Sequence, residues 1–152
     1  MKKVLMVAAL AGVAYGGWHW QHSHHADTES RLLRDRIWVD HMPRNERDMV
    51  NVLVVMSEQP VGVFNATSVW KGTYEGFRYE QSGDELRIVF PQTGDRDRVR
   101  VRARRCKEQG MDYCLDVEGA SRGVKRYYSR EGWDIDRQDE LRAKLEQIQA
   151  AR

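Results

Sequence analysis

The chain has 152 residues, of which 41% are hydrophobic and 32% are charged, an ordinary composition for one globular domain with tails. Its 25 basic and 23 acidic residues leave a formal net charge of only +2, which argues against the strongly basic class of nucleic-acid-binding proteins. We therefore expect no nucleic-acid partner.

The first residues are typical of an export signal. Met1, Lys2 and Lys3 form a short positive start, and the uncharged segment 4–17 follows. That segment is short for a membrane span, which favours a signal peptide over residues 1–17. Residues 18–20, Trp-His-Trp, lengthen the apolar run and add interfacial tryptophans, so an uncleaved membrane anchor over residues 4–20 is the alternative. Either way the sequence predicts a periplasmic or secreted protein, with or without an inner-membrane anchor.

Residues 18–30 are expected to form a polar, histidine-rich tether before a short helix over 27–36, because they show no hydrophobic period. Neutral imidazoles at this spacing can bind zinc, copper or nickel. No strand or helix pattern is present to orient the rings, so a solvated tether is the preferred interpretation, without metal or cofactor. The weak candidate ligands are His19, His22, His24 and His25.

From residue 37 the hydrophobic pattern has a period of two, which predicts β-strands. Short turns rich in glycine join the strands, and such turns demand antiparallel neighbours. The sequence thus predicts an all-β domain over 31–133, an antiparallel meander of about eight strands closed into a barrel or partly open, with a β-sandwich as the alternative. The expected strands are 36–41, 49–56, 62–70, 74–80, 85–90, 98–106, 113–117 and 124–129.

The segment 134–152 is expected to contain one amphipathic helix. Leu141, Leu145 and Ile148 recur at helical spacing, with acidic residues at the start. We expect the helix to pack on the outside of the barrel, and partner binding is the alternative.

An eight-strand meander followed by a helix resembles the lipocalin-type barrel in its order of elements. Trp38 lies in the expected first strand, but Arg36 stands where that family usually has glycine. The resemblance therefore implies the architecture only.

The only two cysteines, Cys106 and Cys114, flank Gly110 in a predicted hairpin. With Gly110 at its centre they face each other, which predicts a disulfide and hence an oxidising compartment. The rival interpretation, a pair of metal-binding thiolates, offers too few ligands for structural zinc. The directly opposed pairs in this register are Cys106–Cys114, Arg104–Asp116, Arg102–Glu118, Ala103–Val117 and Arg105–Leu115.

A stripe of arginines follows one face of the strand 98–106. It is a candidate surface for an anionic polymer or acidic lipid headgroups. No aromatic residue interleaves with it, so base stacking has no platform, and pairing with acidic residues favours an ordinary outer face. The stripe consists of Arg98, Arg100, Arg102 and Arg104.

Aromatic residues are frequent in the expected strands. They can line a cavity for a small apolar ligand, or they can fill the core, and period-two placement does not separate these readings. The candidate ligand-binding residues are Trp38, Phe64, Trp70, Phe77, Tyr79 and Phe90.

A catalytic site has little support. Asp40 and His41 are half of an acid–base arrangement, with Glu46 or Asp48 nearby, but no nucleophile motif accompanies them. We therefore expect a non-enzymatic envelope protein. One hypothesis is a barrel that binds an apolar or amphipathic small ligand. The other is a solid barrel that acts in protein–protein interaction or assembly through its C-terminal helix or the arginine stripe.

Overall fold

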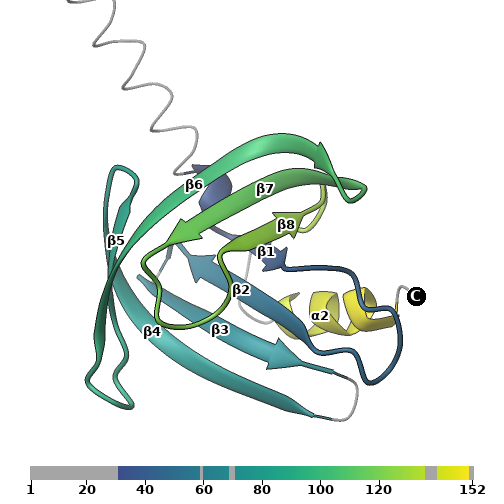
Figure 1. Cartoon of the computed structure of the whole chain (residues 1–152), viewed down its shortest axis with the longest axis horizontal. Helices are drawn as coiled ribbons and strands as arrows, with labels where there is room; N and C mark the ends of the chain where they lie inside the picture. Colours follow the sequence, from purple (N-terminus) through teal and green to yellow (C-terminus); the bar gives the residue numbers. More distant parts are fainter. Residues whose placement is uncertain (1–30, 59, 69–70, 136–139, 151–152) are drawn as a thin grey trace, which may run out of the picture.

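The computed structural model describes residues 31–58, 60–68, 71–135 and 140–150. It shows a closed barrel of eight antiparallel strands in sequence order, followed by one helix (Figure 1), as the sequence predicts. Each strand pairs with the next, and β8 closes on β1 through Val39 and Tyr128. The elements are β1 (Arg36–Val39), β2 (Val50–Met56), β3 (Val61–Thr67), β4 (Gly72–Ser82), β5 (Glu85–Val89), β6 (Arg96–Glu108), β7 (Met111–Glu118), β8 (Arg126–Ser129) and α2 (Glu140–Ala150).

The barrel interior is an apolar core. Alternate residues of each strand turn inward, as the period of two requires. Trp38 and Phe90 are completely buried, and the indole N–H of Trp38 donates to the Leu33 carbonyl at 2.9 Å. The interior cluster comprises Leu33, Trp38, Leu53, Val55, Phe64, Phe77, Tyr79, Leu86, Ile88, Phe90, Val99, Val101, Ala103, Tyr113, Leu115, Val117 and Tyr127.

A second apolar cluster lies on the outside of the barrel, over β1 and β2 and the adjoining residues Met111, Cys114 and Tyr128 of β7 and β8. Val50, Val52 and Val54 of β2 belong to it, whereas Leu53 and Val55 of the same strand face the interior. Ile148 of α2 is buried in this outer cluster, and Leu141 and Leu145 pack against it. The helix therefore covers the apolar outer wall, as expected, and β2 is buried on both faces.

The disulfide between Cys106 and Cys114 is present, with the two Cα atoms 5.7 Å apart, but the predicted register is wrong. The turn consists of Gln109 and Gly110, both with positive φ, so Glu108 pairs with Met111. A bulge between Arg105 and Glu108 then displaces the partners of the arginines by two residues. Because the displacement is even, every side chain keeps its predicted face. The observed pairs are Arg104–Cys114, Arg102–Asp116, Arg100–Glu118, Ala103–Leu115 and Arg105–Tyr113.

The barrel end that carries the short β6–β7 turn is closed by the chain that enters β1. Leu33 of the helical residues 31–33 is buried in the core. The Arg36 guanidinium lies 3.9 Å from the Tyr113 ring centre and forms an ion pair with Asp134. Residues 134 and 135 thus belong to the barrel end rather than to the helix.

The predicted signal or anchor, the polar tether with its four histidines, and Trp70 lie outside the described residues. Among the residues that are described, no helix has the length and apolar character needed to cross a bilayer.

Candidate functional site

The structure brings together five of the six aromatic residues proposed as ligand-binding; Trp70 is not described. Phe64 lies 5.1 Å from Phe77 and 6.3 Å from Phe90, measured between ring centres. Phe77 lies 6.1 Å from Phe90 and 6.4 Å from Tyr79. A Cβ added at Gly62 would stand 2.2 Å from the Phe77 ring, so glycine makes room for that ring. The aromatic residues contact one another as a core does.

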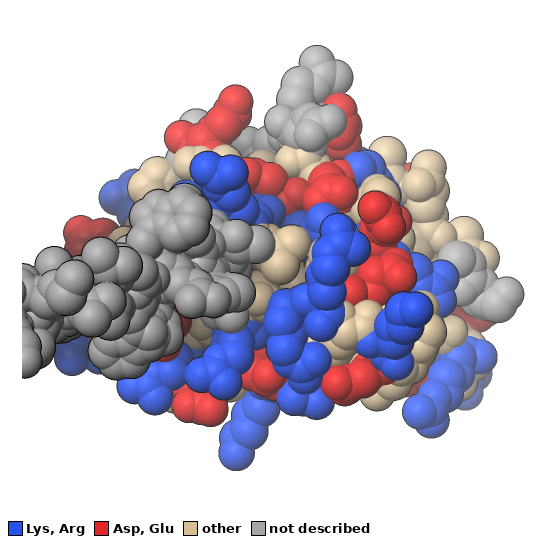
Figure 2. Space-filling model, turned by 90° about the horizontal axis from the view of Figure 1, so that it is seen from above, with Lys and Arg blue, Asp and Glu red and all other residues tan. Residues whose placement is uncertain are grey.

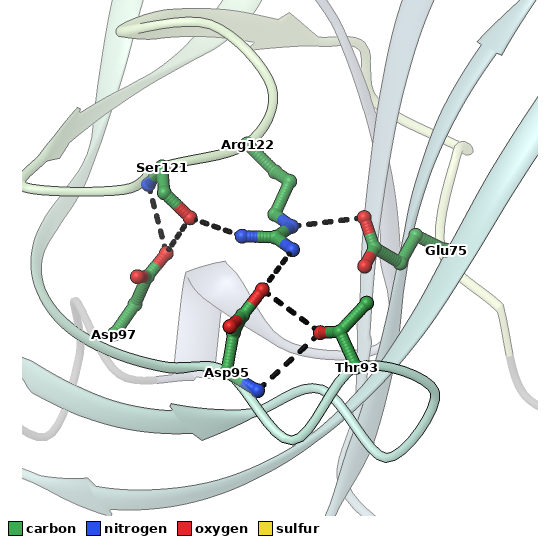
Figure 3. Close-up of polar contacts among 6 residues, drawn as sticks. All are labelled: Glu75, Thr93, Asp95, Asp97, Ser121 and Arg122. Atoms are coloured by element: carbon green, nitrogen blue, oxygen red, sulfur yellow. Dashed lines mark hydrogen bonds and ion pairs between the residues drawn. The ribbon is translucent and has the colours of Figure 1, made fainter.

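A polar cluster, hereafter the mouth cluster, covers the opposite barrel end (Figure 3). Arg122, in the β7–β8 loop, donates to Glu75 of β4 at 2.9 Å and to Asp95 of the β5–β6 turn at 2.7 Å. Its third nitrogen donates to the Ser121 hydroxyl at 2.6 Å. These bonds tie three separate chain segments together across the barrel end. The mouth cluster consists of Glu75, Thr93, Asp95, Asp97, Ser121 and Arg122.

Arg122 lies between solvent and the aromatic core. Its side chain is 24% exposed, and its guanidinium carbon lies 4.2 Å from the Phe90 ring centre. The hydrogen bonds to Glu75 and then to Asp95 raise the pKa of Arg122, and the bond from Arg122 lowers the pKa of the Asp95 carboxyl. Arg122 is therefore a charged side chain that is held by hydrogen bonds and covers the Phe90 ring at the end of the core.

The rest of the β7–β8 loop packs into the same barrel end. Gly123 has a φ of 74°, and a Cβ there would stand 2.1 Å from the Tyr127 hydroxyl and 2.8 Å from Phe64. The Tyr127 hydroxyl accepts a hydrogen bond from the Val124 amide at 3.0 Å. Ala120 and Val124 pack against the interior cluster. The loop thus closes the barrel as part of its core.

Burial of Tyr127 makes stability sensitive to alkali. Desolvation raises its pKa to about 12, whereas an unfolded chain has a tyrosine pKa of about 10. The folded state holds the proton more tightly, so this contribution is complete below about pH 10 and is lost as the pH rises towards 12. We expect the free energy of unfolding to fall by about 2–3 kcal/mol over that interval. Urea unfolding at stepped pH, with tyrosinate absorbance, measures the loss.

The control for this result is Tyr127→Phe, which removes the titrating group. The free energy of unfolding of this variant should fall less between about pH 10 and about pH 12 than that of the unchanged protein. Tyr79, whose pKa is also raised by burial, contributes in the same direction and remains in the variant. An unchanged alkaline slope in Tyr127→Phe would assign the effect to other groups.

The outward side chains of β4–β8 form a surface rich in arginine, here called the arginine face. Figure 2 views the molecule from the side of β6 and β7 in Figure 1, and shows basic and acidic side chains interleaved there. All four arginines of the predicted stripe belong to it, since Val99, Val101 and Ala103 between them face inward. The face comprises Arg78, Arg87, Arg96, Arg98, Arg100, Arg102, Arg104 and Arg126.

Ion pairs neutralise part of the arginine face. Hydrogen bonding to Asp116 raises the pKa of Arg126, at a distance of 2.7 Å. Within the described part of the chain, Arg78, Arg96 and Arg102 form no ion pair with a carboxylate. The neutralising pairs are Arg87–Glu85 at 3.5 Å, Arg98–Glu85 at 3.4 Å, Arg100–Asp84 at 3.5 Å, Arg100–Glu118 at 3.9 Å, Arg104–Glu108 at 3.2 Å and Arg126–Glu108 at 3.1 Å.

Two grooves lie on the arginine face. One crosses β6, β7 and the start of β8, where Arg102 and Lys125 contribute to its wall. The other crosses β4, β5 and β6 around Val89, which is 37% exposed. In this second groove Val89 pairs with Arg78 on one side and with Arg96 on the other.

In the candidate acid–base arrangement, the His41 ring lies between two carboxylates. Nδ1 of His41 lies 2.8 Å from Asp40, and Nε2 lies 3.2 Å from Asp48. The Arg44 amide donates to Asp48 and lowers the pKa of that carboxyl, while Asp40 accepts two hydrogen bonds from Asn51. Each ring nitrogen of His41 faces a carboxylate, so these contacts tie the β1–β2 loop to the end of β1.

In the described ranges, one group of side chains meets the spacing of metal ligands: Cys106, Glu108 and Cys114. Its two sulfur atoms are bonded to each other, so they are not thiolate ligands. The geometry therefore assigns this group to the disulfide.

The mouth cluster is the feature that sequence reasoning missed. The segment 118–123, EGASRG, reads as a turn, and its arginine gives no sign that it reaches Glu75 across the barrel. Two glycines that flank a single arginine in a long connection were the available signal. Comparison with protein families, curated proteins and solved structures gives no match to this chain.

Proposed function

We propose that the protein is an exported, non-enzymatic interaction module of the cell envelope, in which the barrel is a scaffold and the arginine face contacts an acidic partner. The observation that carries the proposal is a set of arginines on the outer surface, Arg78, Arg96 and Arg102, that have no carboxylate partner among the described residues. Packing of the interior cluster and of α2 favours a structural role for the two other locations considered, the interior and the helix.

The packing of the interior supports a scaffold. Phe64, Phe77 and Phe90 are each less than 10% exposed and contact one another. A ligand among them would have to displace rings from a core in which added volume is costly. Both barrel ends are covered, one by the chain around Leu33 and one by Arg122. These contacts favour a surface over an interior binding site.

The outer surface divides into two halves of different chemistry. The apolar half over β1 and β2 is covered by α2, so the helix has its partner within the same chain. The charged half, which is the arginine face, has no such cover among the described elements. Arginine is suited to this role because its planar guanidinium pairs with carboxylate, sulfate and phosphate groups in two-point contacts.

The disulfide supports export. Cys106 and Cys114 are bonded, and such bonds persist in oxidising compartments. The positive start and the apolar segment 4–17 are the corresponding sequence signal. An extracytoplasmic location would present the arginine face to envelope proteins, polymers and lipids.

The test of this proposal is retention on an immobilised sulfated polysaccharide across a salt gradient. We expect Arg102→Glu/Lys125→Glu to elute at clearly lower salt than the unchanged protein, because both side chains line one groove and neither forms an ion pair with a described residue. Each of the two cations contributes roughly 1 kcal/mol near an anionic surface, so we expect a loss of affinity of about thirtyfold at low salt.

The matched control is Arg47→Glu/Arg142→Glu. It makes the same change in net charge in the β1–β2 loop and on α2, where the Arg142 side chain is 89% exposed. We expect a much smaller shift in elution. Equal shifts for the two double variants would show that only net charge matters and would reject the arginine face.

A further inference from the structure

We propose that the groove around Val89 binds the phosphate of an anionic phospholipid, so that the outer face of β4–β6 lies on a membrane surface. This inference rests on the proposed function and deepens it, because it names the acidic partner and the residues that contact it. The residues concerned, here called the lipid patch, are Tyr74, Arg78, Val89 and Arg96.

The strand pairing sets two guanidinium groups on either side of one apolar residue. Val89 is the direct cross-strand partner of both Arg78 on β4 and Arg96 on β6. Directly paired residues on one face of antiparallel strands have Cβ atoms about 4.5–5.5 Å apart. Two long arginine side chains can therefore converge over Val89 on a single phosphate.

The charges in the groove favour the binding of an anionic group from another molecule. Arg78 and Arg96 have no carboxylate partner in the described residues, so binding a phosphate breaks no ion pair there. Arg87 and Arg98, one row further along the strands, share Glu85 at 3.5 and 3.4 Å. Glu80 and Asp97 also line the groove, and Asp97 accepts hydrogen bonds from Ser121. The arginines that line this groove therefore outnumber the carboxylates that line it.

The apolar members of the groove distinguish a lipid from a wholly polar polymer. Val89 is 37% exposed, and Pro60 lines the groove beside it. Tyr74, on the same outward face of β4 as Arg78, is 80% exposed. An exposed tyrosine is suited to the headgroup level of a bilayer, where its ring meets acyl chains and its hydroxyl meets water.

A retained N-terminal anchor would keep this face within reach of a bilayer. Residues 18–30 separate the predicted membrane segment from the first described residue, Arg31. Fully extended, these residues span at most about 45 Å, at about 3.3–3.6 Å for each residue. A retained anchor would therefore hold the lipid patch near the headgroups, and weak contacts would suffice for docking.

The experiment titrates the exported chain with monomeric short-chain phosphatidylglycerol and follows the backbone amides of Arg78, Val89 and Arg96 by NMR. We expect saturable shifts at these amides, and weaker binding of short-chain phosphatidylcholine. In Arg78→Gln/Arg96→Gln the affinity should fall about thirtyfold, since each basic residue near an anionic surface contributes about fivefold. Tyr74→Ser should also weaken binding, whereas Arg47→Gln/Arg142→Gln should not.

Other outcomes reject the inference in distinguishable ways. Inorganic phosphate that shifts the same amides with equal affinity would identify a free-anion site rather than a lipid site. Equal affinity for the two lipids would remove the role of charge. Absence of any lipid binding, with salt-dependent retention on the sulfated polysaccharide intact, would reject the lipid patch and leave the proposed function standing; loss of both would reject both.

Discussion

Replacing Phe77 by alanine is expected to lower the free energy of unfolding by about 3–5 kcal/mol, the largest effect that we predict. Phe77 is 2% exposed and contacts Phe64, Phe90 and Tyr79. Its removal leaves a cavity that the closed barrel wall cannot collapse to fill, so lost transfer free energy and lost packing add together. Urea unfolding of the two proteins measures the difference.

This result separates a filled core from a ligand-binding interior. A ring that merely lines a hollow would cost much less to remove, and the variant would gain no new cavity. Tyr74→Ala on the same strand is the control, because Tyr74 is 80% exposed and its loss should change stability by less than about 0.5 kcal/mol. A Phe77→Ala cost near that of the control, with an apolar molecule extracted from the purified protein, would restore the small-ligand hypothesis.

The fold could be predicted from the sequence because the two features that determine it, the strands and the turns between them, depend on local sequence patterns. Alternation of apolar and polar residues sets each strand, and short turns such as Gln109–Gly110 force the next strand to be antiparallel. Closure of the barrel pairs the edge strands β1 and β8 at Val39 and Tyr128, so that none of the described strands keeps an unpaired edge. Register is less well determined, since one bulge between Arg105 and Glu108 displaced every predicted partner on β6 and β7.

Some members of the candidate sites could be predicted from the sequence and others could not, because only some of them lie on one strand. The arginine stripe was visible because its members alternate along one strand, so their shared face follows from the strand geometry alone. Arg78, by contrast, joins Arg96 only through two strand pairings that the local pattern does not specify. Arg122 reaches Glu75 across 47 positions of sequence, and such a contact depends on barrel closure as a whole.

The second large effect concerns the disulfide. Reduction, or the double substitution Cys106→Ala/Cys114→Ala, is expected to lower the free energy of unfolding by about 2–3 kcal/mol, because the bond closes a short loop in the unfolded chain. The two cysteines are separated by eight positions. Urea unfolding with and without reductant measures the effect, and intact mass of native material counts the thiols.

The two ways of breaking the bond differ in what they remove. Cys114 is completely buried in the outer cluster and Cys106 packs against that cluster, so the alanine variant also loses the packing of both sulfur atoms there. Reduced unchanged protein keeps both sulfurs and loses the covalent link alone. We therefore expect the alanine variant to be less stable than the reduced protein. Native material with two free thiols would contradict the prediction and would also remove the main structural support for an oxidising compartment.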